Sequence, residues 1–215
     1  MKEKEYMRLE SDSIGTMEVP EDAYYGVQAL RAKENFPITG TKLHPVFIKN
    51  LAKIKRAAAI TNRKAGRLKP EIANAIEASA NEVICGMFDK DFIVDGIQGG
   101  AGTSANMNMN EVIANRAIEM LCGKKGDYTI VHPNDHVNMA QSTNDVIPTA
   151  GKLTVLDLLK PLDKSLSLLT DALYDKAAAF DHIVKIGRTQ LEDAVPMRLG
   201  DRKSTRLNSS HSDRS

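Results

Sequence analysis

Three polar segments of this 215-residue chain have side chains suited to binding or chemistry. The first runs from Gly99 to Asn106 and reads Gly-Gly-Ala-Gly-Thr-Ser-Ala-Asn. Its glycines let backbone N–H groups approach a ligand, Thr103 and Ser104 add hydroxyl donors, and a helix starting there would favour an anion. No Gly-Lys-Ser/Thr follows, so it is not a P-loop, and its spacing does not fit a dinucleotide fingerprint. The alternative is a plain loop in which Thr103 or Ser104 caps a helix.

The second segment covers residues 132–138 and reads His-Pro-Asn-Asp-His-Val-Asn. Two histidines four residues apart suggest metal ligation, but Pro133 disturbs helical geometry and no thiol or carboxylate cluster accompanies them. We therefore expect no metal. His132, Asn134 and Asp135 remain candidates for a second site or an ordinary loop, in which Asn134 or Asp135 caps a helix.

The third segment, residues 141–145, reads Gln-Ser-Thr-Asn-Asp and precedes a long apolar stretch. Ser142, Thr143 and Asn144 can bind carboxylate oxygens without bringing a full charge, although a solvated loop would use the same residues. A shorter element, Gly-Arg-Thr-Gln at 187–190, offers similar donors where the helical segment is expected to end. Together the spacing predicts anion binding by neutral donors, and no more than that.

Helical periodicity identifies the elements that must position these segments. Residues 1–43 are punctuated by proline and glycine, which predicts turns or short strands. Helices are expected from Pro45 to Gly66 and from Pro70 onward, because proline suits a first helical turn and glycine a helix end. A short extended piece is predicted at 92–94. Another helix follows the glycine-rich segment and stops at Gly123.

Leucines spaced three and four apart between 153 and 180 predict a long helix of the bundle type, with a kink or break at Pro161. The fold class is therefore expected to be mainly α. We predict a small mixed domain over 1–143 and the beginning of a helical bundle over 144–200. Residues 201–215 have one large apolar side chain and no period, resemble translated vector sequence, and are predicted to be a disordered, non-native tail.

Composition excludes several functional classes. The formal net charge is +1, with both signs mixed along the chain, which argues against nucleic-acid or membrane-surface partners. No apolar run approaches the roughly 18 residues of a membrane span, and the charged N-terminus does not resemble a signal peptide. We expect a cytoplasmic protein in which Cys85 and Cys122 are free thiols.

Taken in order, the polar segments resemble conserved blocks of the aspartase/fumarase superfamily. The similar stretches cover nearly all of 8–200: an opening from Glu10 to Gln28, then the blocks 99–117, 132–145 and 187–197. Class II fumarases tend to read Gly-Ser-Gly-Thr-Gln-Ser, Ser-Ser-Asn-Asp and Gly-Arg-Thr-His in three of these places. This chain reads Gly-Gly-Ala-Gly-Thr-Ser, Ser-Thr-Asn-Asp and Gly-Arg-Thr-Gln, which favours the aspartate ammonia-lyase branch over fumarase.

The resemblance implies reversible elimination of ammonia from L-aspartate to give fumarate, through an aci-carboxylate intermediate, with no metal or organic cofactor. It places substrate contacts on Thr103, Ser104 and the 142–144 segment, with Thr103, Ser142 and Thr143 on the β-carboxylate and Asn144 at the other end of the substrate. Thr189 and Gln190 would complete the pocket near the amino group. A glutamine at 190 can position the substrate but cannot carry a proton. The histidine that fumarases have there can do so.

The resemblance also implies what this chain lacks. In the superfamily the general base is a serine on a glycine- and serine-rich loop far beyond residue 200, and no such loop occurs here. We therefore expect no catalytic residue in this sequence, a truncated fragment that is inactive alone, and a homotetramer for the full-length protein. A non-catalytic binding fragment is the alternative.

Overall fold

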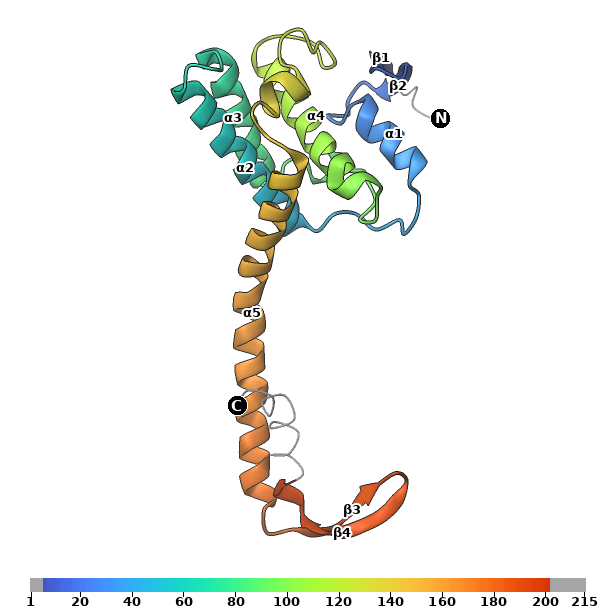
Figure 1. The fold of residues 1–215 in the computed structure, drawn as a ribbon, viewed down its shortest axis with the longest axis vertical. Coiled ribbons are helices and arrows are strands. Elements are labelled where there is room, and N and C mark those ends of the chain that lie inside the picture. The colour runs from blue at the N-terminus through green and yellow to red at the C-terminus, as the bar shows by residue number, and fades with distance from the viewer. Residues whose placement is uncertain (1–5, 202–215) are drawn as a thin grey trace. The chain divides into compact units, whose positions relative to one another are not determined.

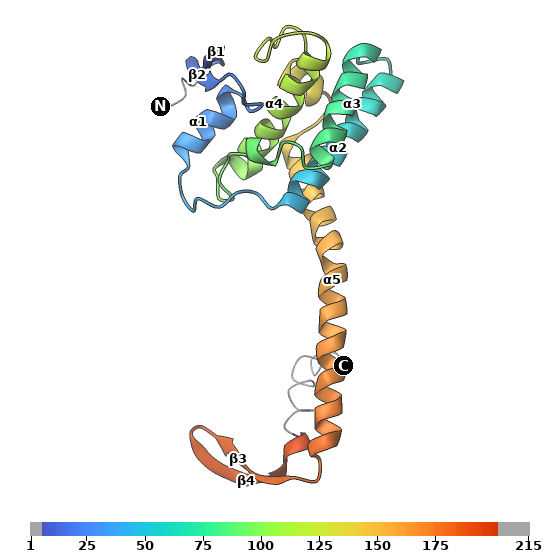
Figure 2. The ribbon, with the colours of Figure 1, turned by 180° about the vertical axis from the view of Figure 1, so that it is seen from behind.

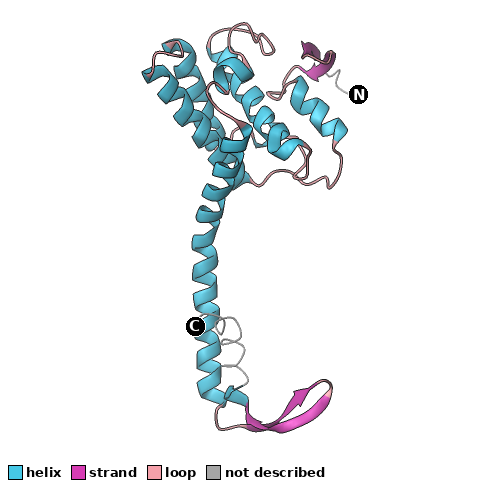
Figure 3. Cartoon of the chain, viewed as in Figure 1, coloured by secondary structure: helices cyan, strands magenta, loops and turns pink. Residues whose placement is uncertain are grey.

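A computed structural model describes residues 6–201, which form two compact units, one reaching to Asp157 and the other beginning at Leu158. Each unit is considered by itself. Helices dominate both, and the strands are confined to two short hairpins (Figure 3). The expected fold class, mainly α with a small strand-containing part, is confirmed. The tail predicted for 201–215 lies outside the described residues except for Asp201.

Helix α4 (Thr103–Met120) is the central element of the first unit. It packs against α1 (Val27–Asn35) on one side and against α3 (Pro70–Ile84) on another, while α2 (Pro45–Lys64) lies along α3 (Figures 1 and 2). Thirteen of its 18 residues are buried, including Met109, Ile113 and Ile118. Such burial around the whole circumference is typical of a helix enclosed by others, and it gives the polar side chains of α4 a fixed frame.

The boundaries of α2 and α3 follow from local signals. Each begins with proline at its first position, and the imidazole Nδ1 of His44 accepts from the Val46 N–H (3.2 Å) at the start of α2. Gly66, with φ of 68°, follows the end of α2 in the left-handed conformation. Both predicted helices are confirmed.

Helix α1 was not predicted from the sequence. Its N-cap is Gly26, which has no capping side chain, and two distant carboxylates take that role. Glu111 accepts from the backbone N–H groups of Gly26, Gln28 and Ala29 (2.9–3.0 Å), and Glu10 accepts from that of Val27 (3.0 Å). A Cβ at Gly26 would lie 2.7 Å from Glu10 Oε2, so only glycine fits between the carboxylates.

Replacing Glu111 with glutamine is expected to lower the free energy of unfolding by about 1–3 kcal/mol. Glu111 is 1% exposed, and its two oxygens serve three amide donors. Glutamine keeps one oxygen and turns an NH₂ group towards N–H donors, which leaves buried donors unpaired. Urea unfolding monitored by circular dichroism measures the change.

The exposed Glu71→Gln variant in α3 is the matched control and should unfold like the wild type. Equal stability of Glu111→Gln and Glu71→Gln would show that the carboxylate does not hold α1. Burial raises the pKa of Glu111 to about 7, against the three amide donors that favour its ionised form. The comparison is therefore made above pH 8, where the carboxylate is ionised.

The strands of the first unit are β1 (Met7–Ser11) and β2 (Thr16–Pro20), antiparallel with Met7 opposite Pro20 and Ser11 opposite Thr16. They confirm the short strands expected before residue 43. The predicted extended piece at 92–94 forms no strand; the nearest pairing is an isolated bridge between Lys42 and Asp95. Short helical turns occupy Asp89–Asp91 (η1), Gly100–Gly102 (η2) and, as a π-helix, Pro133–Val137 (η3).

Helix α5 spans Thr143–Phe180, and the boundary between the units lies within it. In the first unit it is anchored by the buried Val146 and Ala150 and by Asn50, which donates to Thr154 Oγ1 (3.3 Å) and Asp157 Oδ2 (3.1 Å). A kink or break was predicted at Pro161, and the helix continues through it without a break, because a proline removes one backbone donor without necessarily ending a helix. The domain boundary at 143/144 stays a prediction.

The second unit continues with the hairpin β3 (Val184–Thr189) and β4 (Glu192–Arg198). The 187–190 segment thus lies on a strand and its turn, and the helix ends at Phe180, earlier than expected. None of the helices within residues 6–201 is long and apolar enough to cross a membrane.

Candidate active site

The glycine-rich segment forms a tight turn that leads directly into α4. Gly100, Ala101 and Gly102 have φ of 73°, 51° and 92°, three successive left-handed conformations. A Cβ at Gly99 would lie 2.7 Å from the Phe36 ring, and one at Gly102 would lie 2.8 Å from Ile147 Cγ2. Glycine is therefore required at 99 and 102 by close packing, and at 100 and 102 by backbone conformation.

Two polar side chains fix this turn from its N-terminal side. Gln98 accepts from the Ala105 N–H (2.6 Å) and donates to the Asp95 carbonyl (3.0 Å), closing the loop over the first turn of α4. The Asp95 carboxylate accepts from the Thr39 hydroxyl (2.6 Å) and from the backbone N–H groups of Thr39, Gly40 and Ile97. These donors lower the pKa of Asp95, so it stays ionised as a structural anchor.

Thr103 and Ser104 occupy the first turn of α4, as the anion-binding interpretation requires. The N-cap is Gly102, so the alternative in which Thr103 or Ser104 caps the helix is wrong. The Thr103 hydroxyl donates to the Gly100 carbonyl (2.6 Å), and Thr103 is exposed. It must rotate away from that carbonyl to donate to a ligand.

Ser142, Thr143 and Asn144 form the N-terminus of α5. The Ser142 carbonyl accepts from the N–H groups of Asp145 and Val146 (3.0 Å each), and its hydroxyl accepts from the Asn144 N–H (3.3 Å). Ser142 therefore starts the helix. Ser142 and Asn144 are exposed and Thr143 is half-buried. The segment combines hydroxyl and amide donors with the positive end of a helix dipole.

The two helix N-termini lie beside each other. The Asn106 amide donates to Thr143 Oγ1 (3.2 Å), and Gly102 packs against Ile147 one turn into α5. The structure thus brings the Thr103 and Thr143 segments together, as the order of the motifs suggested. The positive ends of two helix dipoles, together with neutral hydrogen-bond donors, can attract a carboxylate without the help of a lysine or arginine side chain.

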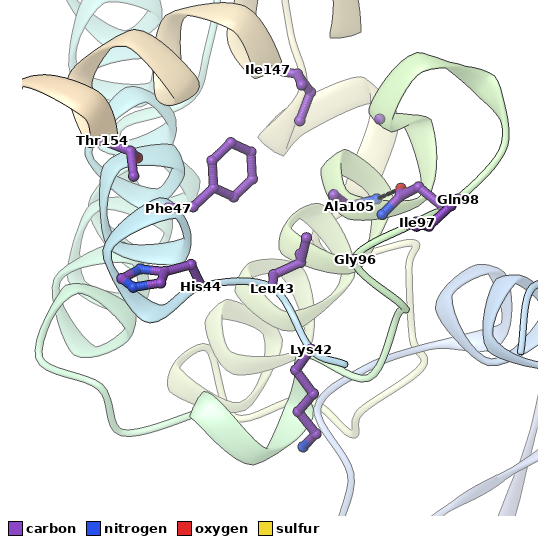
Figure 4. A pocket seen from close by; sticks show the side chains of 11 residues that line it. Lys42, Leu43, His44, Phe47, Gly96, Ile97, Gln98, Ala105, Ile147 and Thr154 are labelled. Atoms are coloured by element: carbon purple, nitrogen blue, oxygen red, sulfur yellow. Dashed lines mark hydrogen bonds between the residues drawn. The ribbon is translucent and has the colours of Figure 1, made fainter. Parts of the chain in front are cut away.

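A cavity of about 630 Å³ lies next to this junction, with Gly102, Ala105 and Ile147 among its lining residues. Figure 4 shows Phe47 and Leu43 projecting towards the same space as Ile147. Thr103, Ser142 and Thr143 do not line it, so it is distinct from the polar site.

The 132–138 segment folds as the π-helix η3, capped by His132 and not by Asn134 or Asp135. His132 Nδ1 accepts from the N–H groups of Asn134 and Asp135 (3.2 Å each), and His136 Nδ1 accepts from the His132 N–H (2.9 Å). Both rings thus use one nitrogen for local structure, and burial lowers the pKa of His136. Within residues 6–201 no group of three or more His, Cys, Asp or Glu side chains has the arrangement of a metal site.

Thr189 and Gln190 lie at the tip of the β3–β4 hairpin in the second unit, and both are exposed. Gln190 and Leu191 have φ of 50° and 68°, as in a two-residue turn of the primed type. Such conformations cost non-glycine residues roughly 1–2 kcal/mol each. These two predicted site residues therefore belong to the hairpin of the second unit.

Sequence reasoning missed a buried polar cluster behind Thr143. Lys55 of α2 is 0% exposed, and its ammonium group donates to Asn138 Oδ1 (2.8 Å). Burial lowers the pKa of Lys55 to about 7. Asn106 and Asn110, one turn apart on α4, are 2% and 0% exposed. The spacing of the sequence indicates this burial, because Lys55 stands four residues from both Leu51 and Ala59 on the buried face of α2.

Comparison with known proteins agrees with the blocks identified in the sequence. An aspartate ammonia-lyase of Bacillus sp is 52% identical over 194 residues, covering 90% of this chain and 42% of that protein. A class II fumarate hydratase of Halobacterium salinarum is 54% identical over 194 residues, covering 90% and 41%. The crystal structure of a fumarate lyase:delta crystallin from Brucella melitensis matches with a TM-score of 0.87 and 46% identity, covering 97% of this chain and 49% of that one.

The chain spans about two fifths of the length of the curated relatives it matches. The sequence model of a family described as lyase matches residues 15–214, nearly the whole chain. Together with the helical fold and the paired helix N-termini, this match shows that the chain belongs to the lyase family.

Proposed function

We propose that this chain supplies the dicarboxylate-binding part of an aspartate ammonia-lyase, which converts L-aspartate to fumarate and ammonia. The observation that carries the proposal is the junction of α4 and α5, where the Thr103 and Thr143 segments present neutral donors at two helix N-termini. Removal of a Cβ proton from aspartate places a second negative charge on the β-carboxylate. Preorganised donors stabilise that charge as an oxyanion hole does.

In the proposed complex, Thr103, Ser142 and Thr143 contact the β-carboxylate, and Ser104 is a further substrate contact. Asn144 binds the opposite end of the substrate. By the family resemblance, the assembled full-length protein also uses Thr189 and Gln190 as contacts to the substrate amino group. No metal or organic cofactor takes part. A base located outside this sequence removes the proton, so the chain alone binds substrate without turning it over.

The candidate substrates are separated by a direct assay. The full-length protein is incubated with L-aspartate or with L-malate, and fumarate is followed by absorbance at 240 nm. Fumarate is expected from aspartate, because Gln190 stands where fumarases have a histidine, and its amide cannot act as a catalytic acid or base at neutral pH. Fumarate from malate alone would contradict the proposal and support the second candidate, a class II fumarase, which the 54% identity to the Halobacterium salinarum protein favours.

We also propose that the full-length protein is a homotetramer assembled through α5. The six leucines between Leu158 and Leu169 of this helix are 40–62% exposed, among them Leu162 and Leu166. Contiguous apolar surface of this kind marks protein–protein contact.

The 215-residue chain is therefore expected to self-associate, and the double variant Leu162→Glu, Leu166→Glu to be largely monomeric. Sedimentation velocity over a range of concentrations measures both. Lys164→Glu, on the same exposed helix, is the control and should associate like the wild type. A wild-type chain that stays monomeric and unfolds cooperatively in urea would refute assembly through this face.

A further inference from the structure

Lys55 lies in the interior of the first unit, where its ammonium group belongs to a chain of side-chain hydrogen bonds. Its Nζ donates to Asn138 Oδ1 (2.8 Å), and the Asn106 amide nitrogen lies 3.2 Å from the same oxygen. That nitrogen also lies 3.2 Å from Thr143 Oγ1. This series of hydrogen bonds therefore links a buried cation to a hydroxyl of the proposed substrate site.

The orientation of the Asn138 amide is determined at both of its ends. Its oxygen faces Lys55 Nζ, which is a donor. Its nitrogen faces the Gln141 carbonyl (3.3 Å), which can only accept. Rotating the amide by 180° would set donor against donor at one end and acceptor against acceptor at the other.

The orientation of Asn106 follows from that of Asn138. Because Asn138 presents an oxygen, Asn106 must present its NH₂ group, and the same group reaches Thr143 Oγ1. Asn106 Oδ1 is buried and has no hydrogen-bond partner among the described residues. The Thr143 oxygen consequently accepts a hydrogen bond, and its single proton is left for an acceptor outside the cluster.

We propose that Lys55 is a positioning residue that, through Asn138 and Asn106, holds the Thr143 hydroxyl as a hydrogen-bond donor towards a substrate carboxylate. A carboxylate only accepts, so a donor of fixed polarity favours it. Lys55 itself does not touch the ligand. The identity of the ligand rests on the proposed function, whereas the direction of the hydrogen bonds rests on the four side chains and the Gln141 carbonyl.

Two substitutions test whether a donor at position 55 is what matters. Lys55→Met removes the donor and keeps a long apolar stem, whereas Lys55→Gln keeps an NH₂ donor without the charge. Ser79→Ala is the control, since Ser79 is 0% exposed and its hydroxyl donates to the Ile113 carbonyl in another part of the core. All three are prepared in the 215-residue chain and in the full-length protein.

The first measurement is nuclear magnetic resonance of the 215-residue chain. In Lys55→Met the side-chain NH₂ signals of Asn138 and Asn106 are expected to shift or broaden. In Lys55→Gln and Ser79→Ala they should stay near their wild-type positions. Unchanged signals in Lys55→Met would overturn the proposal, whatever reaction the protein catalyses.

The second measurement is steady-state kinetics of the full-length protein with L-aspartate. Lys55→Met is expected to lower kcat/KM by about tenfold or more, because the donor to Asn138 is lost, and Lys55→Gln to retain most of it, because an uncharged donor remains. Equal losses in both variants would overturn the proposal.

If Lys55→Met does not fold, Asn106→Leu removes the donor to Thr143 instead. A wild-type kcat/KM in Asn106→Leu would overturn the proposal. A wild-type protein inactive on aspartate would refute the proposed function. The resonance measurement would still decide the direction of the hydrogen bonds from Lys55 to Thr143.

Discussion

Replacing Thr143 with valine is expected to lower kcat/KM for L-aspartate in the full-length protein by about 10²- to 10³-fold, the loss typical of removing one oxyanion-hole donor. Valine has the shape of threonine, so the N-terminus of α5 should form as before. What disappears is the hydroxyl, whose oxygen accepts from Asn106 (3.2 Å) and whose proton is free for substrate.

The loss should fall mainly on kcat. A hydrogen bond to a carboxylate strengthens when that group acquires a second negative charge, so the missing donor costs the transition state more than the bound substrate. Absorbance of fumarate at 240 nm gives both kinetic constants.

Thr61→Val is the matched control for this substitution. The Thr61 hydroxyl donates to the Ala57 carbonyl (2.8 Å) on an exposed face of α2 and lies within no candidate site. Its kinetics should remain within about threefold of the wild type, as expected of a surface substitution. If Thr143→Val also retained wild-type kcat/KM, the junction of α4 and α5 would not be where charge develops.

Local signals predicted the parts of the fold whose ends are determined by neighbouring residues. Pro45 and Pro70 start α2 and α3, and Gly66 follows the end of α2 in a left-handed conformation. The glycine-rich turn before α4 and the start of α5 after Ser142 were likewise readable from residue type and spacing. The resemblance of the polar segments to conserved blocks of the superfamily, and not their spacing alone, named Thr103, Thr143 and their neighbours as one candidate site.

Features that depend on distant residues could not be predicted in this way. Helix α1 begins at a glycine and is capped by Glu111, 85 residues further along the chain. The 187–190 segment was expected where the helical segment ends, yet it belongs to β3 and the hairpin turn. Long-range pairing, which no local pattern specifies, decides both cases.

Burial of a lysine is the clearest example of tertiary structure overriding residue type. Lysine is almost never fully buried, so a lysine within a helix is by default assigned to the solvent face. Lys55 nevertheless lies in the apolar stripe of α2, and Asn138, directly after η3, accepts a hydrogen bond from its Nζ. Only the folded arrangement of α2 and η3 shows that the stripe encloses a cation.

That burial makes stability depend on pH in a specific direction. The pKa of Lys55 falls from 10.5 to about 7 on folding, so between these values the unfolded chain binds a proton that the folded chain does not. Raising the pH through this window removes the proton from the unfolded state and stabilises the fold. The slope approaches about 1.4 kcal/mol per pH unit for one such group.

The test compares urea unfolding of the wild type and Lys55→Met at several pH values between 7 and 10. The difference in unfolding free energy between them cancels the titration of groups they share, such as Lys125, whose pKa burial also lowers. At neutral pH methionine avoids the cost of burying an ammonium group but loses the hydrogen bond to Asn138. Relative to the variant, the wild type should therefore gain stability steadily as the pH rises. A difference independent of pH would mean that Lys55 keeps its ordinary pKa in the folded chain, because a proton held equally by both states cannot link folding to pH.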